Sequence, residues 1–127
     1  MADTPTDFAA IGGEPALRTI IEDFVDRCFD DLMIGYLFPR ERREHVKEFE
    51  YQHAAEHLGA NVEYRGRPLE KAHAPHRVKG GQFDRRLVIL DDVLSAHAVP
   101  DAVKARWLEA NASLRSKITN QSAGECL

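Results

Sequence analysis

The sequence predicts an all-α protein. Apolar residues recur with the period of a helix in four long segments, and stretches rich in glycine and proline separate these segments. No segment of useful length shows the apolar–polar alternation of a β-strand. Four helices of this length fit a bundle or a globin-like arrangement of crossing helices, and periodicity alone does not choose between the two.

The N-terminal half contains two of the four helices. The first opens at Glu14-Pro15, since proline is favoured in a first helical turn. Its apolar stripe consists of Leu17, Ile20, Ile21, Phe24, Val25, Cys28 and Phe29. A short apolar piece over 32–38 follows, and a second long helix is expected from about Arg42 to Leu58, where a glycine can terminate it.

The C-terminal half begins with a short segment over 69–73, which the following proline interrupts. The third helix carries the apolar residues Phe83, Leu87, Leu90 and Leu94, and the fourth carries Val103, Trp107, Ala110, Leu114 and Ile118. We expect a single domain over 1–127 with its core at about 8–118 and a disordered tail at 121–127.

The charge balance disfavours a nucleic-acid partner. The formal net charge is -4 over 127 residues, and an acidic chain lacks the basic face that phosphate binding needs. Arg40, Arg42 and Arg43 do cluster, but Glu41 and Glu44 alternate with them, which indicates a solvated helix start.

The cysteines and the N-terminus favour a cytoplasmic location without a membrane partner. The two cysteines are Cys28, inside an apolar stripe, and Cys126, in the tail. They suggest no disulfide framework, so a reducing compartment is expected. The opening MADTPTDF does not resemble a signal peptide, and no apolar run has the length of a membrane span.

His73 is the first candidate for a functional residue. It ends a short helical piece just before Pro75. A haem iron needs a neutral imidazole on a short, oriented segment, and the end of such a segment leaves carbonyl groups free to accept from its second nitrogen. His76 is the competing ligand on the same segment, and a partly exposed loop histidine is the alternative interpretation.

The second long helix carries a stripe that begins apolar and becomes polar. Its members are Val46, Phe49, Glu50, His53 and His57. Polar groups on a stripe shared with apolar residues are costly unless they are partnered, so they indicate a functional site. Alternatively, the helix is rotated, Ala54, Ala55 and Leu58 face the core, and Glu50 reaches solvent.

A non-haem metal site on the same helix is a further alternative. His53 and His57 form an H-x-x-x-H pair that one helix face could present to a metal. Zinc peptidases place a glutamate directly after the first histidine, where this chain has Ala54. An iron bundle would need carboxylate and histidine pairs from other helices, and the face of the first long helix supplies none.

Several motifs in order resemble the truncated haemoglobin family, from about Phe8 to Ile118. They are FAAIGGEPAL, IIEDFVDRCFDD, LFP, HLGANVEYRGRPLEKAHAPHRV and QFDRRLVILDDVLSAHAVP. The resemblance implies a globin-like, two-over-two helical sandwich that encloses haem, with haem b (iron protoporphyrin IX) as the cofactor.

The resemblance also implies roles for individual residues. His73 corresponds to the proximal iron ligand, Phe38 to the phenylalanine that packs on the haem ring, and Arg77 to a basic residue that pairs with a propionate in some members. An apolar slot of the kind that haem needs is expected from Phe24, Val25, Phe29, Phe38, Val46 and Phe49.

Three positions depart from the family pattern. Val25 replaces a tyrosine that donates to oxygen, Glu50 replaces a glutamine or another donor, and Arg86 replaces a tryptophan found in some groups. We therefore expect an atypical distal pocket in which Glu50, His53 and Arg86 form the polar network. Glu50 and Arg86 are expected to face each other, whereas the alternative leaves Arg86 in solvent beside Arg85.

The expected function is a haem globin that binds oxygen, nitric oxide or peroxide, with a reductase as a further partner. One alternative is a haem-dependent oxidoreductase, peroxidase-like or nitric oxide detoxifying, in which Glu50, His53 and Arg86 are catalytic. Another is a gas or redox sensor with His53 as a second axial ligand.

Overall fold

The computed structural model describes residues 6–61 and 80–114, which form helices joined by short turns. The helices are α1 (Asp7–Ala10), α2 (Gly13–Asp30), α3 (Arg43–His57), α5 (Gly80–Ala96) and α6 (Asp101–Ala112), with 3₁₀ turns η1 (Gly35–Leu37) and η2 (Arg40–Arg42). These two ranges contain no strand, and the four predicted long helices are all present. No helix within them has the length and hydropathy needed to cross a membrane.

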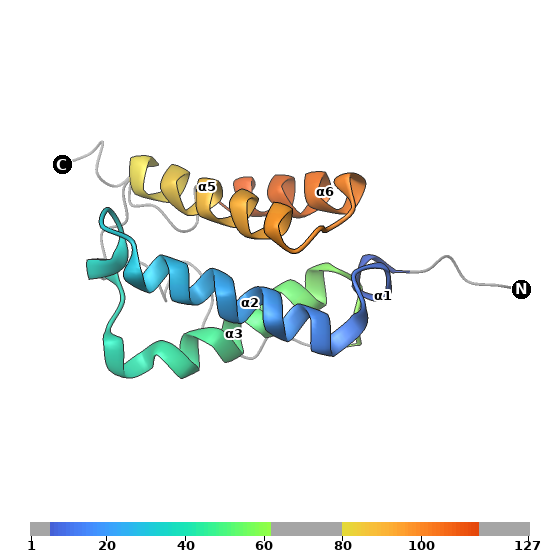
Figure 1. The fold of residues 1–127 in the computed structure, drawn as a ribbon, viewed down its shortest axis with the longest axis horizontal. Coiled ribbons are helices and arrows are strands. Elements are labelled where there is room, and N and C mark those ends of the chain that lie inside the picture. Colours follow the sequence, from blue (N-terminus) through green and yellow to red (C-terminus); the bar gives the residue numbers. More distant parts are fainter. Residues whose placement is uncertain (1–5, 62–79, 115–127) are drawn as a thin grey trace, which may run out of the picture.

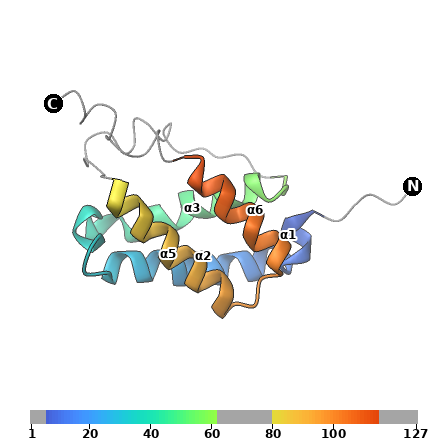
Figure 2. The ribbon, with the colours of Figure 1, turned by 90° about the horizontal axis from the view of Figure 1, so that it is seen from above.

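The long helices form two layers of two. Figure 1 shows α5 and α6 in one layer and α2 and α3 in the other, and Figure 2 shows the same arrangement from above. The central helix is α2, which packs against both α3 and α5, while α6 packs against α5. Within the described residues, this confirms the predicted two-over-two sandwich.

The core is centred on α2. All seven members of its predicted apolar stripe are buried, from Leu17 to Phe29. The opposite layer contributes Leu90 and Leu94 of α5 and Trp107 of α6, each at most 2% exposed. Because buried apolar surface supplies most of the stability of a helical domain, this contact between layers fixes the frame on which the site is built.

The helix α3 is rotated so that Ala54, Ala55 and Leu58 face the core, which was the alternative to a polar inward stripe. One part of that alternative is not observed. Tyr51, Ala54, Ala55 and Leu58 are buried, as a helix turned toward its alanines requires. Glu50 is only partly exposed, however, because its side chain is 27% accessible to solvent. The polar members of the stripe therefore lie at the edge of the core and not outside it.

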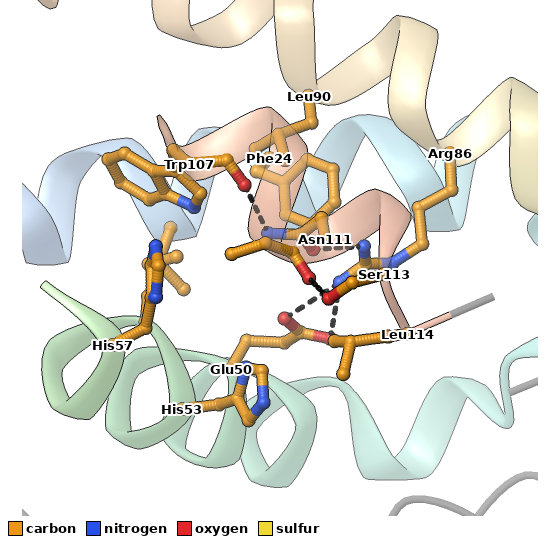
Figure 3. Close-up of a pocket in the computed structure, with 13 residues that line it drawn as sticks. Phe24, Glu50, His53, His57, Arg86, Leu90, Trp107, Asn111, Ser113 and Leu114 are labelled. Atoms are coloured by element: carbon orange, nitrogen blue, oxygen red, sulfur yellow. Dashed lines mark hydrogen bonds and ion pairs between the residues drawn. The ribbon is translucent and has the colours of Figure 1, made fainter. Parts of the chain in front are cut away.

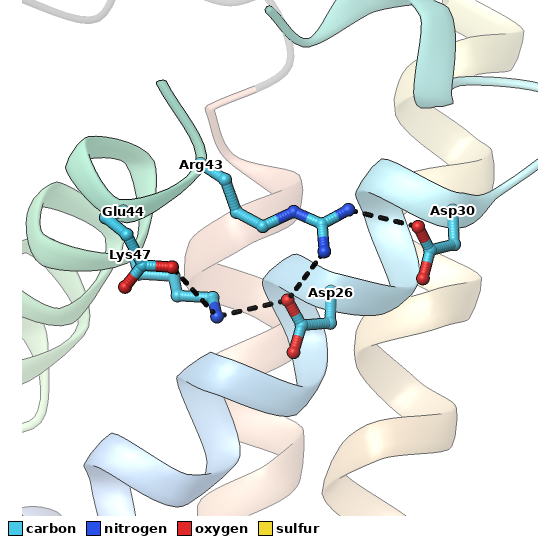
Figure 4. A network of polar contacts seen from close by, with 5 residues as sticks. All are labelled: Asp26, Asp30, Arg43, Glu44 and Lys47. Atoms are coloured by element: carbon cyan, nitrogen blue, oxygen red, sulfur yellow. Dashed lines mark hydrogen bonds and ion pairs between the residues drawn. The ribbon is translucent and has the colours of Figure 1, made fainter. Parts of the chain in front are cut away.

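The basic cluster before α3 differs from the solvated helix start that we expected. Arg43 is half-buried and joins α3 to α2, with its Nη1 and Nη2 at 3.4 Å and 3.0 Å from the carboxylates of Asp26 and Asp30 (Figure 4). Its guanidinium also lies 4.7 Å from the centre of the Phe29 ring. The prediction is wrong for Arg43, because α2 places acceptors and an aromatic face within its reach.

Candidate functional site

A cavity of about 220 Å³ lies between α2, α3, α5 and α6. Its apolar walls include Phe24 of α2, Leu90 of α5, and Trp107 of α6, together with Leu114 just after that helix. Polar side chains enter it from three of these four helices (Figure 3). An apolar cavity with a few convergent polar groups is the usual form of a small-molecule or cofactor site.

Arg86 is the centre of the polar network in this cavity. Figure 3 shows it extending from α5 between Glu50 of α3 and Asn111 of α6. Its Nη2 donates to both carboxylate oxygens of Glu50 at 3.0 Å and 3.2 Å, and its Nη1 donates to Oδ1 of Asn111 at 2.6 Å. The guanidinium also lies 5.0 Å from the centre of the Phe24 ring. Four helices are thus joined through one side chain.

The ion pair between Glu50 and Arg86 is largely removed from water. The side chain of Arg86 is 14% exposed and that of Glu50 is 27% exposed. A charge pair in such surroundings interacts more strongly than a surface pair, and neither partner is easily removed alone. The expected contact between these two residues is present, and the alternative that placed Arg86 in solvent is wrong because its side chain is only 14% exposed. Its neighbour Arg85 pairs separately with Asp31 at 2.8 Å.

His53 and His57 line the same cavity from successive turns of α3. Burial lowers the pKa of His53, and the nearby Glu50 carboxylate opposes that shift. The lowered pKa favours a neutral imidazole at neutral pH, which can donate or accept a proton or ligate a metal. No three His, Cys, Asp or Glu side chains of the described ranges come together to hold a metal, which gives the non-haem site no support.

The predicted site residues divide into two sets in the described structure. Phe24, Glu50, His53 and Arg86 line the cavity together. Val25 and Phe29 lie in the core of α2, and Phe38 stacks on Phe29 with ring centres 4.9 Å apart. The half-buried Val46 and Phe49 lie on α3 outside the residues that line the cavity. His73, His76 and Arg77 fall outside the described residues.

Sequence reasoning missed Asn111, which the structure places at the cavity. Asn111 is 7% exposed, and its Nδ2 donates to the backbone carbonyl of Trp107 at 3.1 Å. A signal was available, because Asn111 follows Trp107 by four residues and so shares its apolar face. A polar residue at such a position requires partners, which here are that carbonyl and Arg86.

Comparisons with known proteins identify the family of this chain. A family model described as bacterial-like globin matches residues 6–120. The chain is 27% identical over 124 residues to a group 1 truncated haemoglobin, GlbN, of Mycolicibacterium paratuberculosis, covering 98% of this chain and 91% of the relative.

Solved structures of the same kind share the fold. Truncated haemoglobin from Tetrahymena pyriformis in its Fe(III) form superposes with a TM-score of 0.83 at 21% identity, covering 91% of this chain and 98% of the other. The group II truncated haemoglobin from Bacillus anthracis gives 0.83 at 20% identity and 94% coverage of both chains. Haemoglobin from Chloroflexus aurantiacus gives 0.81 at 26% identity, with 92% and 99% covered.

Proposed function

Because the chain belongs to the bacterial-like globins and is a haem-binding globin of the truncated haemoglobin kind, we propose that it binds a small diatomic ligand in the cavity that Glu50, His53 and Arg86 share. The observation that carries the proposal is the ion pair between Glu50 and Arg86 inside this cavity. A fixed positive group and a fixed negative group at a ligand site select for the charge and polarity of what enters.

The described residues fit a haem. Phe24 and Trp107 offer flat aromatic surfaces and Leu90 an aliphatic one, which suit a planar macrocycle, and the polar groups of the lining come mainly from α3 and α6. The cavity of about 220 Å³ is lined by residues within 6–61 and 80–114, and the segment that contains His73 lies between these ranges in the sequence. When bound, haem supplies an iron centre at which a small ligand coordinates.

His73 is proposed as the proximal ligand, on the strength of its position before Pro75 and of the family resemblance. Replacing His73 with Ala should abolish stoichiometric haem uptake, or leave a weakly held haem with an altered spectrum. The Soret band of the purified protein measures this. His76→Ala is the matched control, and a loss of the band in that variant alone would assign the ligand to His76.

The proposed role of Arg86 in ligand binding is tested separately. Arg86 is the cationic donor in the cavity lining, and Val25 cannot donate in place of the family's tyrosine. Removing a hydrogen bond from a charged donor is expected to raise the dissociation rate of oxygen from the loaded protein by about tenfold or more. The comparison is between Arg86→Met and Arg106→Met, since Arg106 pairs with Asp7 on the surface. Equal rates in the two variants would contradict the proposal.

A second candidate is a haem-dependent oxidoreductase that acts on peroxide. It is favoured by the presence of a carboxylate, an imidazole with lowered pKa and a guanidinium in one cavity. In that function Glu50 or His53 moves a proton and Arg86 stabilises developing negative charge. Turnover with peroxide and a reducing substrate should then fall in Glu50→Gln and His53→Gln, whereas an absence of turnover in the unmodified protein would leave the ligand-binding function.

A further inference from the structure

Asn111 differs from the other residues of the core. It is the buried polar residue of the described part of the chain, and it lies on the apolar face of α6, one turn after Trp107. Burying an amide costs free energy unless both of its ends are paired. Here both ends are paired, because Nδ2 donates to the Trp107 carbonyl and Oδ1 accepts from Arg86.

The chemistry of the amide matches both contacts at once. A carboxylate at this position could accept from Arg86 but could not donate to the Trp107 carbonyl, and an aliphatic side chain could do neither. The carbonyl belongs to the rigid interior of α6, four residues earlier in the same helix. The acceptor that Asn111 presents to Arg86 is therefore fixed in place by its own helix.

The position of Arg86 depends on this acceptor. An arginine side chain is long and flexible, and holding it in one place requires several contacts. In the cavity the guanidinium has an anchor on each side, Glu50 from α3 and Asn111 from α6 (Figure 3). Glu50 is 27% exposed and alone is a weaker anchor than a buried group. Loss of the contact with Asn111 would therefore let the guanidinium move away from the cavity. The Glu50 carboxylate would then remain there without its partner.

We propose that Asn111 is a positioning residue that holds the Arg86 guanidinium inside the cavity beside the Glu50 carboxylate and thereby sets how well the cavity accepts anionic relative to neutral ligands. The inference rests on the proposed function in one respect, that the ligand enters this cavity. It adds the class of ligand that the network discriminates and a residue, Asn111, that acts on the ligand through Arg86.

The test compares ligands of different charge on the ferric, haem-loaded protein. Azide is the anionic probe and nitric oxide the neutral one, and the variants are Asn111→Leu, Arg86→Met and the double variant. The affinity for azide should fall about tenfold in Asn111→Leu, as expected for the loss of one charged hydrogen-bond partner, while the affinity for nitric oxide changes little. The double variant should bind azide no more weakly than Arg86→Met alone, because Asn111 acts on the ligand only through the guanidinium that Arg86→Met removes.

A purely structural role for Asn111 gives a different pattern. Both affinities would then fall together, and the effects of the two substitutions would add, and either result overturns the inference. An unchanged azide affinity in Arg86→Met would also overturn it, since Arg86 would then not act on the ligand. If Asn111→Leu does not fold, Asn111→Ala removes the same two contacts with a smaller side chain and takes its place.

Thermal unfolding gives a readout that does not depend on ligand binding. The shift in unfolding temperature of the double variant should be smaller than the sum of the two single shifts, because the residues share one contact. Additive shifts would contradict the positioning contact. If the unmodified protein shows no Soret band, the proposed function is overturned. If it shows the band and Asn111→Leu binds azide with unchanged affinity, only this inference is overturned.

Discussion

The ion pair between Glu50 and Arg86 should contribute to folding as well as to ligand binding. Arg86→Met leaves a partly buried carboxylate and the Asn111 amide oxygen without their donor. The expected loss is about 1–3 kcal/mol in the free energy of unfolding, the usual effect of unpaired buried polar groups. Denaturant unfolding monitored by circular dichroism measures it.

A matched surface pair provides the control for this prediction. Arg106 donates to Asp7 at 2.8 Å and 2.9 Å with good geometry, but the arginine side chain is 57% exposed. Water replaces the lost contacts there, so Arg106→Met should change stability much less. A similar loss in both variants would mean that burial does not strengthen the pair in the cavity.

His53 should make the stability of the protein depend on pH. Because burial lowers its pKa below the ordinary 6.5, the unfolded chain takes up a proton at this residue more readily than the folded protein does. Stability should therefore be full above pH 6.5 and should decrease as the pH falls through the interval between 6.5 and the lowered pKa. His53→Gln should flatten this slope in unfolding curves measured across the interval, while the same change at the exposed His45 should leave it intact. A slope that persists in His53→Gln would assign it to another group.

The side chain of Asp31 stabilises the turn that follows α2. The Asp31 carboxylate accepts from the backbone N–H groups of Met33 and Ile34, and from Arg85 on α5. The hydrogen bonds from Arg85 are the main reason that the pKa of Asp31 lies below its usual value. This side chain therefore holds the turn after α2 and attaches it to the opposite layer.

Gly35 in η1 is predicted to tolerate no side chain. A Cβ built at this position would lie 2.4 Å from the backbone carbonyl oxygen of Phe29, and that backbone cannot move without disturbing the end of α2. Gly35→Ala should therefore lower the unfolding free energy by about 1–3 kcal/mol, the usual cost of overpacking. Gly81→Ala is the control, because nothing lies within 4 Å of a Cβ there and alanine suits a helix better than glycine. Equal stability of the two variants would refute the close approach.

The elements could be predicted from the sequence where apolar periodicity is regular. The α2 stripe is apolar at each inward position, so both its helix and its buried face were correct. In α3 two of the inward residues are alanines, and glutamate and histidine lie at neighbouring positions, so two rotations had comparable support. Packing decided between them, because Ala54 and Ala55 allow α3 to approach α2 closely and leave Glu50 at the edge.

The site was predictable only in part, for a related reason. The contact between Glu50 and Arg86 could be expected, because each is a charged residue at a position next to the apolar face of its helix, and the two faces meet in the predicted fold. The role of Asn111 could not, because its importance depends on Arg86, which is 25 residues away in the sequence. Similarly, the pairing of Arg43 with Asp26 and Asp30 depends on how α3 crosses α2, which local charge patterns do not reveal.

At the scale of the whole molecule, the cavity separates two helices that have little contact of their own. Within the described ranges α2 packs against α3 and α5, and α6 packs against α5, while direct packing between α3 and α6 is sparse. The link between them passes through the cavity, by way of Glu50, Arg86 and Asn111. In the haem-free protein, α3 and α6 should therefore open more readily than α2.

Haem loading should stabilise these two helices most. A group that binds only the folded protein stabilises the elements that it contacts, and the cavity is lined mainly by α3 and α6, with two residues each from α2 and α5. Amide hydrogen exchange, measured with and without haemin, should show a larger gain of protection in 43–57 and 101–112 than in 13–30. His73→Ala, which is proposed not to hold haem, should show no such gain under the same conditions. An equal gain along the whole chain would mean that α3 and α6 unfold together with the core even without haem. A gain confined to α2 would contradict the proposed location of the haem in the cavity.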